Sequence, residues 1–508
     1  MNVLLLVLPN AVFFVALMLL TLRAERASRA AALEDRAAKR GGFGLEYFLG
    51  SRSLSGVVLA MTLTATYGSV SSFVSGPGVA WQLGLGWVVF AAPQMLAGFF
   101  LLGLLGRKTA LLSRAFNAVT VVDLIRARYA SKTLAVLSAL ALLLFFTVMI
   151  AGQFVGGAAV LATTTGLPHA AGLLVFGGLT VLYTAFGGFR AVAVTDTLCA
   201  VLMVAGMLIL GGELLSLAGG WDAFTAGIAS ASTLNASGAT GAAGSFMTPD
   251  AGGLLPWPLL LSAWVLVGFG TAGLPQSIVR AMSYRTSADL HQAIRVGTLV
   301  CGALMIGMTF IGVLARGVVS AWPEGLPTTD HLIPYVLTQH MNPFVAGVTL
   351  IGPLAATMST VSSLLIAAAS AVVHDLLKLT GPEVEDVRVK RIARFGTGAL
   401  GVAALLIALD PPSIVAWINL AAFGGLELTF LIPFVGGLYW RRASAAGAVA
   451  AIVSGLLTYG ALLLVKPDLG GWHPVVPAFV VEALVFAAFG VLNRKSLEGE
   501  AARFFPRR

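Results

Sequence analysis

The sequence predicts an all-α polytopic membrane protein, and three observations carry that prediction. Of the 508 residues, 58% are hydrophobic and only 10% are charged, and the mean hydropathy is +0.93. A soluble protein with an ordinary polar surface has about a quarter of its residues charged. The apolar residues also gather in segments of about 20 residues or more, which is the length that a helix needs to span a bilayer.

Apolar segments follow one another along the whole chain, and we expect about thirteen transmembrane helices with boundaries good to about 2–4 residues. The expected spans are 3–22, 54–80, 84–106, 131–163, 169–186, 192–216, 257–283, 293–318, 343–378, 391–409, 412–436, 443–465 and 474–492. The first span lacks the basic segment that begins a cleaved signal peptide, so we expect it to be retained. Residues 1–508 are predicted to form a single transmembrane domain.

The basic residues indicate how the spans are oriented. Of the 31 Lys and Arg residues, all except Arg316 and Lys466 lie in or beside the connections that follow odd-numbered spans. Cytoplasmic connections carry such an excess of Lys and Arg. We therefore expect the N-terminus outside and the C-terminus inside a multi-pass protein of the cell's inner (plasma) membrane. The net charge of +9 then reports topology and gives no reason to expect a nucleic-acid partner.

Motifs that carry enzyme chemistry are missing from the sequence. It contains no phosphate-binding GxxxxGK loop, no HExxH and no CxxC, and its six histidines show no metal-ligand spacing. Cys199 and Cys301 both fall inside apolar segments, so no disulfide framework is implied. The sequence therefore does not predict an enzyme.

The second span, 54–80, has the composition of a binding site. Hydroxyl-bearing residues and glycines fill the middle of the stretch from Val57 to Trp81, which a plain lipid-facing helix would not need. A helix interrupted within the bilayer at Gly76 and Pro77 would free backbone carbonyls to hold an ion or a solute. Close helix packing through small residues, with Ser and Thr as hydrogen-bonding groups, explains the same composition equally well.

The seventh span, 257–283, repeats this pattern. Gly273 and Pro275 lie near its middle, and a proline there removes a backbone hydrogen bond and clashes with the preceding turn. The second interrupted span comes an odd number of spans after the first, so the two cross the membrane in opposite directions. That arrangement predicts an inverted repeat, with halves 54–216 and 257–436 around a site at the midplane.

Hydroxyl groups in the ninth span could complete such a site. Ser359, Thr360, Ser362 and Ser363 offer neutral oxygens inside an apolar segment. Oxygen ligands suit a hard cation such as sodium. The same side chains could instead bond back to the carbonyls of their own helix.

Three acidic residues also lie inside apolar segments. Asp196, at the start of the sixth span, is a candidate functional group because ionisable residues at that depth are costly to bury. It could attract a cation or neutralise Arg190. For Glu427 and Glu482 a paired structural role is the stronger interpretation, because their spans lack surrounding hydroxyl groups.

Several motifs, taken together and in order, resemble the sodium/solute symporter family over nearly the whole chain. They are EYFLGSRS at 46–53, MTLTATY at 61–67, SGPG at 75–78, YTAFGGFRA at 183–191, GLPQSIVRAMSY at 273–284, AATMST at 355–360, FGGLE at 423–427 and GLYWRR at 437–442. Within the family, the TLTATY and FGxxGLPxxxVRxxSY stretches are most similar to the sodium/pantothenate members.

The resemblance implies a LeuT-like inverted repeat of about thirteen helices, in which inward sodium flow drives solute uptake by alternating access. The first span and the last two, 443–492, lie outside the repeat. The resemblance also implies a sodium site. Its ligands would be the backbone carbonyls of Ala65, Gly68 and Ala356 and the hydroxyls of Ser359 and Thr360, with Asp196 close by.

We expect sodium-coupled uptake of a small organic solute, which the resemblance implies is pantothenate. The candidate substrate contacts near the two breaks are Thr66, Tyr67, Ser71, Ser72 and Thr271. No Arg or Lys is predicted at midplane depth, so half-helix dipoles and hydroxyls would recognise the solute carboxylate. Sodium symport of an amino acid, a monocarboxylate or a sugar, and solute sensing without transport, stay open. The expected partners are the solute, sodium and the lipid bilayer, with no obligate protein partner.

Overall fold

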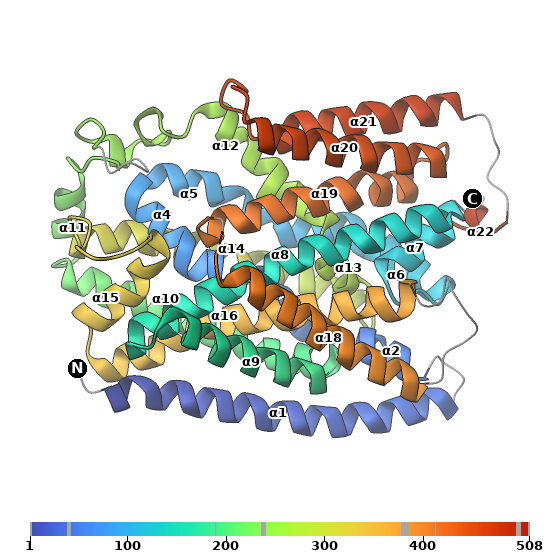
Figure 1. Ribbon diagram of the computed structural model, residues 1–508, viewed down its shortest axis with the longest axis horizontal. Coiled ribbons are helices and arrows are strands. Elements are labelled where there is room, and N and C mark those ends of the chain that lie inside the picture. The colour runs from blue at the N-terminus through green and yellow to red at the C-terminus, as the bar shows by residue number, and fades with distance from the viewer. Residues whose placement is uncertain are drawn as a thin grey trace.

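The computed structural model describes residues 3–37, 42–187, 189–234, 240–376, 386–411, 413–493 and 499–505. Within these ranges every regular element is a helix, and isolated bridges join only Leu54 to Tyr284 and Leu234 to Thr240. The long helices run in a common direction, which is horizontal in Figure 1. The prediction of an all-α protein is confirmed.

The elements divide into long and short helices. The long helices are α1 (Val3–Ala37), α8 (Lys132–Thr165), α9 (His169–Gly187), α10 (Phe189–Leu217), α14 (Ser287–Val318), α16 (Pro343–Ser370), α18 (Asp386–Ala408), α19 (Val415–Tyr439), α20 (Ala445–Val465) and α21 (Val475–Leu492). The shorter α-helices are α2 (Gly42–Leu49), α3 (Gly56–Tyr67), α4 (Gly76–Leu83), α5 (Leu85–Ala91), α6 (Arg107–Ala115), α7 (Val121–Tyr129), α11 (Trp221–Ile228), α12 (Trp257–Ala263), α13 (Pro275–Ala281), α15 (Leu332–His340) and α22 (Gly499–Ala502). The short 3₁₀ and π segments are η1 (Gly50–Arg52), η2 (Ser71–Ser75), η3 (Ala92–Leu96), η4 (Phe99–Gly106), η5 (Ser245–Met247), η6 (Ala251–Gly253), η7 (Trp264–Gly268), η8 (Phe269–Gly273), η9 (Thr329–His331) and η10 (Ala371–Leu376).

Most of these helices have the length and composition of membrane spans. In the described part of the chain, 10 helices are continuous and apolar enough to cross a bilayer, and 2 bent helix pairs pass the same test together. The shorter apolar helix α9 is a further candidate. Each predicted span coincides with one of these helices, so the protein is a polytopic membrane protein, while the exact number of crossings stays a prediction.

Helix α16 occupies the centre of the bundle. In its most apolar stretch 94% of the residues are buried, whereas the corresponding figure for α20 and for α21 is 28%. Small residues let neighbouring backbones approach α16 closely. A methyl group added to Gly206 of α10, for example, would lie only 3.5 Å from the Cα of Gly352 in α16. Polar groups carried by α16 are therefore screened from lipid by the surrounding helices.

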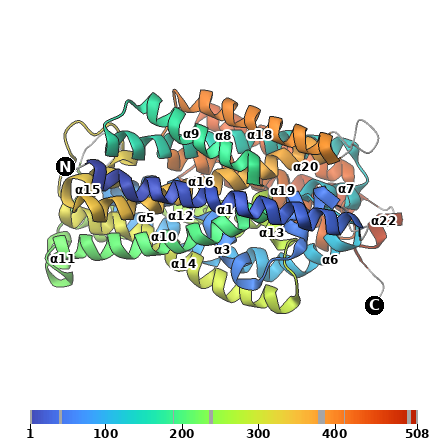
Figure 2. The same cartoon turned by 90° about the horizontal axis from the view of Figure 1, so that it is seen from below.

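The two ends of the chain lie at opposite ends of the bundle (Figures 1 and 2). Helices α6 and α7 lie near the C-terminus, and α11 and α15 lie near the N-terminus (Figure 1). An odd number of crossings produces this arrangement. Which end faces the cytoplasm stays a prediction from the distribution of basic residues.

The first bent pair changes direction earlier than the sequence suggested. Its two halves, Gly56–Tyr67 and Ser71–Leu83, meet at an angle of 65°. The bend therefore falls at residues 68–70, and the prediction of a break at Gly76 and Pro77 is wrong. Pro77 lies in the first turn of α4. The π segment η2 runs directly into α4, with the Gly76 N–H donating to the Ser71 carbonyl, so the chain does not bend at Pro77.

The second bent pair breaks where the sequence placed the break. Its halves, Trp257–Gly273 and Pro275–Ala281, meet at 49°. Between them Leu274 is extended, with φ −76° and ψ 116°, because a residue before proline avoids the helical conformation. The bend thus lies between Gly273 and Pro275, and the division of the chain into two inverted halves stays a prediction.

Candidate ion and solute site

The predicted sodium ligands meet where α3 ends against the middle of α16. The Ser359 hydroxyl lies 2.8 Å from the Ala65 carbonyl oxygen and 3.0 Å from that of Ala356. The Thr360 hydroxyl lies 3.2 Å from the Gly68 carbonyl oxygen. The fold thus brings together, from two separate helices, all of the residues predicted to hold the cation.

The geometry of α3 explains why these carbonyls are available. The last carbonyls of a helix have no N–H partner in a following turn, and α3 ends at Tyr67 before the chain bends away. The cluster is buried and contains only neutral carbonyl and hydroxyl oxygens. Because hard cations prefer oxygen ligands, these residues fit a sodium ion.

Asp196 pairs with Arg280 and not with Arg190. The Nη2 atom of Arg280 lies 3.1 Å from Oδ2 of Asp196, and the Thr62 hydroxyl donates to the same oxygen at 2.6 Å. Arg190 lies 3.4 Å from Glu46 and is 32% exposed. The alternative in which Asp196 neutralises Arg190 is therefore wrong, because Arg190 is partly exposed and pairs with Glu46 while Asp196 is fully buried and pairs with Arg280.

Arg280 carries a positive charge into the protein interior. Its side chain is 2% exposed, and it donates to the Ser363 hydroxyl and to the Gln276 carbonyl, both at 2.7 Å. Ser363 in turn donates to the Ser359 carbonyl at 2.8 Å, so Asp196 is connected to the sodium-type cluster. The buried Asp196 thus holds Arg280 inside the bundle, and the absence of Arg or Lys at midplane depth stays a prediction.

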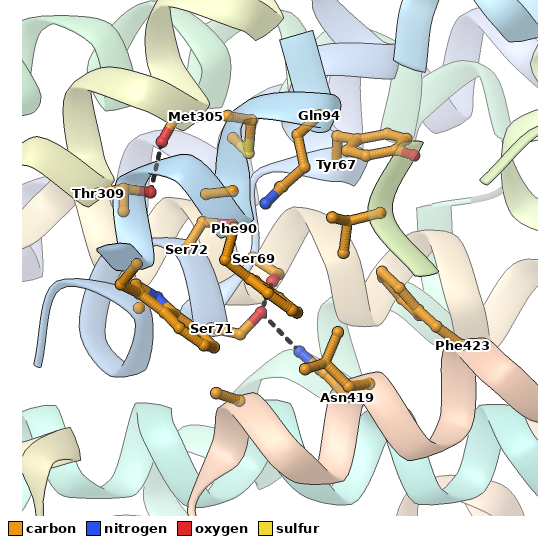
Figure 3. Close-up of a pocket in the computed structure, with 16 residues that line it drawn as sticks. Tyr67, Ser69, Ser71, Ser72, Phe90, Gln94, Met305, Thr309, Asn419 and Phe423 are labelled. Carbon is orange, nitrogen blue, oxygen red and sulfur yellow. Dashed lines mark hydrogen bonds between the residues drawn. The ribbon is translucent and has the colours of Figure 1, made fainter. Parts of the chain in front are cut away.

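A cavity of about 60 Å³ lies beside the first break (Figure 3). Three of the predicted substrate contacts, Tyr67, Ser71 and Ser72, line it. The Asn419 side chain donates to Ser71 Oγ at 2.7 Å, and Ser69 Oγ lies 2.6 Å from the same hydroxyl. The remaining lining residues are Gly76, Trp87, Phe90, Ala91, Gln94, Val267, Met305, Thr309, Ala416, Leu420 and Phe423. Aromatic walls with a few convergent polar groups are typical of small-molecule sites.

Thr66 and Thr271 do not line this cavity. Thr66 Oγ1 lies 3.0 Å from Ser363 Oγ, and the Thr271 hydroxyl donates to the Gly268 carbonyl at 2.5 Å. Successive side chains on a helix point about 100° apart, so Thr66 faces α16 when Tyr67 faces the cavity. Of the predicted substrate contacts, only Tyr67, Ser71 and Ser72 therefore line this cavity.

Two functional candidates, Gln153 and Asn419, were not predicted. Gln153 Oε1 accepts a hydrogen bond from the Val70 backbone N–H at 3.0 Å, and its amide nitrogen lies 3.4 Å from Asn419 Oδ1. Gln153 therefore satisfies the backbone at the first break, and Asn419 connects it to the cavity. A lone amide in a long apolar helix is the signal that could have identified both residues.

Glu427 and Glu482 differ from the sequence interpretation. Both side chains are completely buried, yet neither carboxyl group has a hydrogen-bond partner among the described residues. The expected paired role is therefore wrong for both. Glu427 faces the second broken helix, since a methyl group added to Gly270 would lie 2.8 Å from its carboxyl carbon.

Solved structures of other transporters share this architecture. A Na⁺-coupled sialic acid symporter in a substrate-bound outward-open state matches with a TM-score of 0.77, over 97% of this chain and 99% of its own, at 16% identity. A nucleobase-cation-symport-1 family transporter in a closed conformation matches with a TM-score of 0.55, over 90% of this chain and 97% of its own, at 15% identity. The chain thus shares the fold of these two transporters, and the buried oxygen cluster and the two broken helices lie within that fold.

The family follows from the sequence match. The sodium:solute symporter family model matches residues 47–455, and the chain belongs to that family. A sodium/pantothenate symporter of Escherichia coli is 41% identical over 87% of this chain and 89% of its own length. One from Haemophilus influenzae is 40% identical over 90% and 92%, and a sodium/proline symporter of Staphylococcus aureus is 27% identical over 89% and 88%.

Proposed function

We propose that the protein takes up pantothenate together with sodium by alternating access. The observation that supports pantothenate is the 41% and 40% identity to two sodium/pantothenate symporters over almost the full length of all three chains. Sodium use is a property of the family to which the chain belongs. The alternating motion would open the cavity to one side of the membrane at a time.

We propose that the oxygen cluster binds sodium and that the inner cavity binds the solute. Sodium would bind the carbonyls of Ala65, Gly68 and Ala356 and the hydroxyls of Ser359 and Thr360. Pantothenate would occupy the cavity lined by Tyr67, Ser71, Ser72 and Asn419, which must widen beyond its volume of about 60 Å³ to admit the solute. Since Tyr67 and Gly68 are adjacent at the end of α3, ion binding and solute binding would both fix the same helix end. That shared helix end would couple the two ligands.

Uptake of radiolabelled pantothenate into proteoliposomes tests the proposal. We expect accumulation when sodium is imposed on the outside and none when sodium is equal on both sides. Uptake that ignores the sodium gradient would overturn the coupling, and no uptake with a gradient present would overturn the substrate. A matched preparation with potassium in place of sodium is the control.

A second solute class has weaker support from the sodium/proline symporter at 27% identity. Competition with a panel of unlabelled solutes separates the candidates: proline, short monocarboxylates and sugars should leave pantothenate uptake unchanged. Accumulation of any solute would also exclude a sensor that binds without transport.

A further inference from the structure

A second, larger cavity lies on the side of the bundle where α4 and α14 end. Its volume is about 820 Å³, and the residues that line it are Val79, Gln82, Leu83, Leu234, Thr240, Arg316, Ser320, Ala321, Trp322, Pro327, Thr328, Thr329, Ser413, Ile414 and Trp417. The rings of Trp417 and Trp87 meet edge to face at 5.7 Å, and Trp87 lines the inner cavity. The contact of Trp417, at the start of α19, with Trp87 of α5 therefore lies between the two cavities.

Arg316 is the charged residue in this wall. Its guanidinium lies 4.3 Å from the centre of the Trp81 ring, and the Trp81 indole N–H donates to the Val319 carbonyl at 2.8 Å. The indole therefore holds the last turn of α14 and the Arg316 side chain in one position. A stacked guanidinium keeps its N–H groups free at its edge for hydrogen bonding.

The hydrogen-bonding capacity of Arg316 is largely unused. Its Nη2 atom makes one long contact, 3.4 Å, to the Ser232 carbonyl, and its buried Nη1 atom has no hydrogen-bond partner among the described residues. No described acidic side chain pairs with it or lines the cavity, whose polar wall residues are hydroxyls and one amide. A buried donor without a partner is costly, so this site is built to receive an acceptor.

We propose that Arg316 is an anion-capture site that binds the carboxylate of the incoming solute before it reaches the inner cavity. A guanidinium binds a carboxylate through two parallel hydrogen bonds, which a neutral solute cannot provide. The positive charge would also raise the local concentration of anions at the cavity mouth. Because pantothenate is the carboxylate concerned, the role of Arg316 as a solute site rests on the proposed function.

The test compares pantothenate with its alcohol analogue, in which CH₂OH replaces the carboxylate, as competitors of labelled pantothenate uptake. The unaltered protein should prefer the carboxylate by about tenfold or more, the value of one charge-assisted pair. Arg316→Gln should lose most of that preference, and Arg316→Lys should retain part of it. Lys466→Gln, which removes the other basic residue predicted on the outer side, should change nothing.

A second pair of variants leaves Arg316 in place. Ser320 is exposed and lines the same cavity. Ser320→Asp adds a carboxylate that competes for Arg316 and should lower the preference, whereas Ser320→Asn, of the same size, should not. An unchanged preference in both Arg316→Gln and Ser320→Asp would overturn the anion site. Absence of pantothenate uptake by the unaltered protein would instead overturn the proposed function.

Discussion

Ser359 and Thr360 are the two side chains on which the proposed sodium site depends most directly. Each hydroxyl now lies within hydrogen-bond distance of a carbonyl oxygen at the end of α3. A sodium ion among these oxygens would be bound by the hydroxyl lone pairs, while the hydroxyl protons turn aside. The carbonyl ligands cannot be removed by substitution, so these two positions are where side-chain changes can weaken cation binding.

Replacing both Ser359 and Thr360 with Ala should raise the sodium concentration for half-maximal uptake by about tenfold or more, since two hydroxyl ligands are lost. Uptake measured over a sodium titration in proteoliposomes checks this. Thr357→Ala is the matched control, because in the described part of the chain its hydroxyl bonds only to the Pro353 carbonyl of its own helix. An unchanged sodium dependence in the double variant would place the cation elsewhere.

The Asp196–Arg280 pair makes a prediction about stability. Removing one member of a buried ion pair leaves an uncompensated charge and costs about 3–5 kcal/mol. We expect Asp196→Asn and Arg280→Gln each to lower the melting temperature in detergent strongly, and the double variant to recover part of the loss. If the loss of stability in the double variant equalled the sum of the losses in the two single variants, the two residues would not be paired directly.

At the scale of elements, the bend in the first broken helix is stabilised by a hydrogen bond from its backbone to a side chain of another helix. Val70 has lost its helical hydrogen bond, and Gln153 of α8 supplies the replacement acceptor at 3.0 Å. A buried N–H without an acceptor costs about 1–3 kcal/mol. The bend therefore depends on the contact of Val70 with α8 as much as on the bent segment itself.

Gln153→Leu should lower the stability of the protein by about 1–3 kcal/mol and raise the KM for the solute, because the break forms a wall of the inner cavity. Thermal unfolding and uptake kinetics measure the two effects. Thr147→Ala in the same helix is the control, since among the residues that the structure describes its hydroxyl bonds only to the Leu143 carbonyl. A variant as stable and as active as the unaltered protein would show that the break needs no outside partner.

The connection between α20 and α21 contains a histidine that should make stability depend on pH. Burial lowers the pKa of His473 to about 4, and its Nδ1 atom accepts a hydrogen bond from Val475, which requires the neutral ring. The unfolded chain binds a proton near the usual pKa of about 6.5. The contribution of His473 to stability is thus fully present above pH 6.5 and is lost as the pH drops from 6.5 toward 4, by about 3 kcal/mol.

His473→Asn, which keeps an acceptor for Val475 but cannot titrate, should flatten this part of the stability profile. Thermal unfolding between pH 4 and 8 measures it. The exposed His291→Asn is the control and should leave the profile unchanged. A slope that survives in His473→Asn would assign the pH dependence to other groups.

For the whole molecule, the two termini lie at opposite ends of the bundle (Figure 1), and we predict that the C-terminus faces the cytoplasm. Both native cysteines, Cys199 and Cys301, are buried, so a single added cysteine can be labelled selectively. Lys466→Cys should react with a membrane-impermeant maleimide in intact cells, and Arg442→Cys only after permeabilisation; both positions are exposed. The reverse pattern would place the N-terminus inside.

Composition and local pattern predicted the bundle, its spans and the second break, and they indicated the hydroxyls of the ninth span as candidate ion ligands. These features are encoded within short stretches: apolar length sets a span, Pro275 stops a helix, and Ser359 and Thr360 lie next to each other on one turn. Their meeting with Ala65 and Gly68 could be expected only from the family resemblance, because residues about 290 apart must be brought together.

Tertiary structure alone decided where the first broken helix bends, that Arg280 is buried and which hydroxyls face the inner cavity. Val70 depends on Gln153, 83 residues away, and Arg280 depends on Asp196, 84 residues away. Such partners satisfy groups that a bilayer cannot, since no water is available there. The sequence by itself thus determined which segments cross the membrane and which carry polar groups. Which polar groups meet one another was settled only by the packing of distant helices.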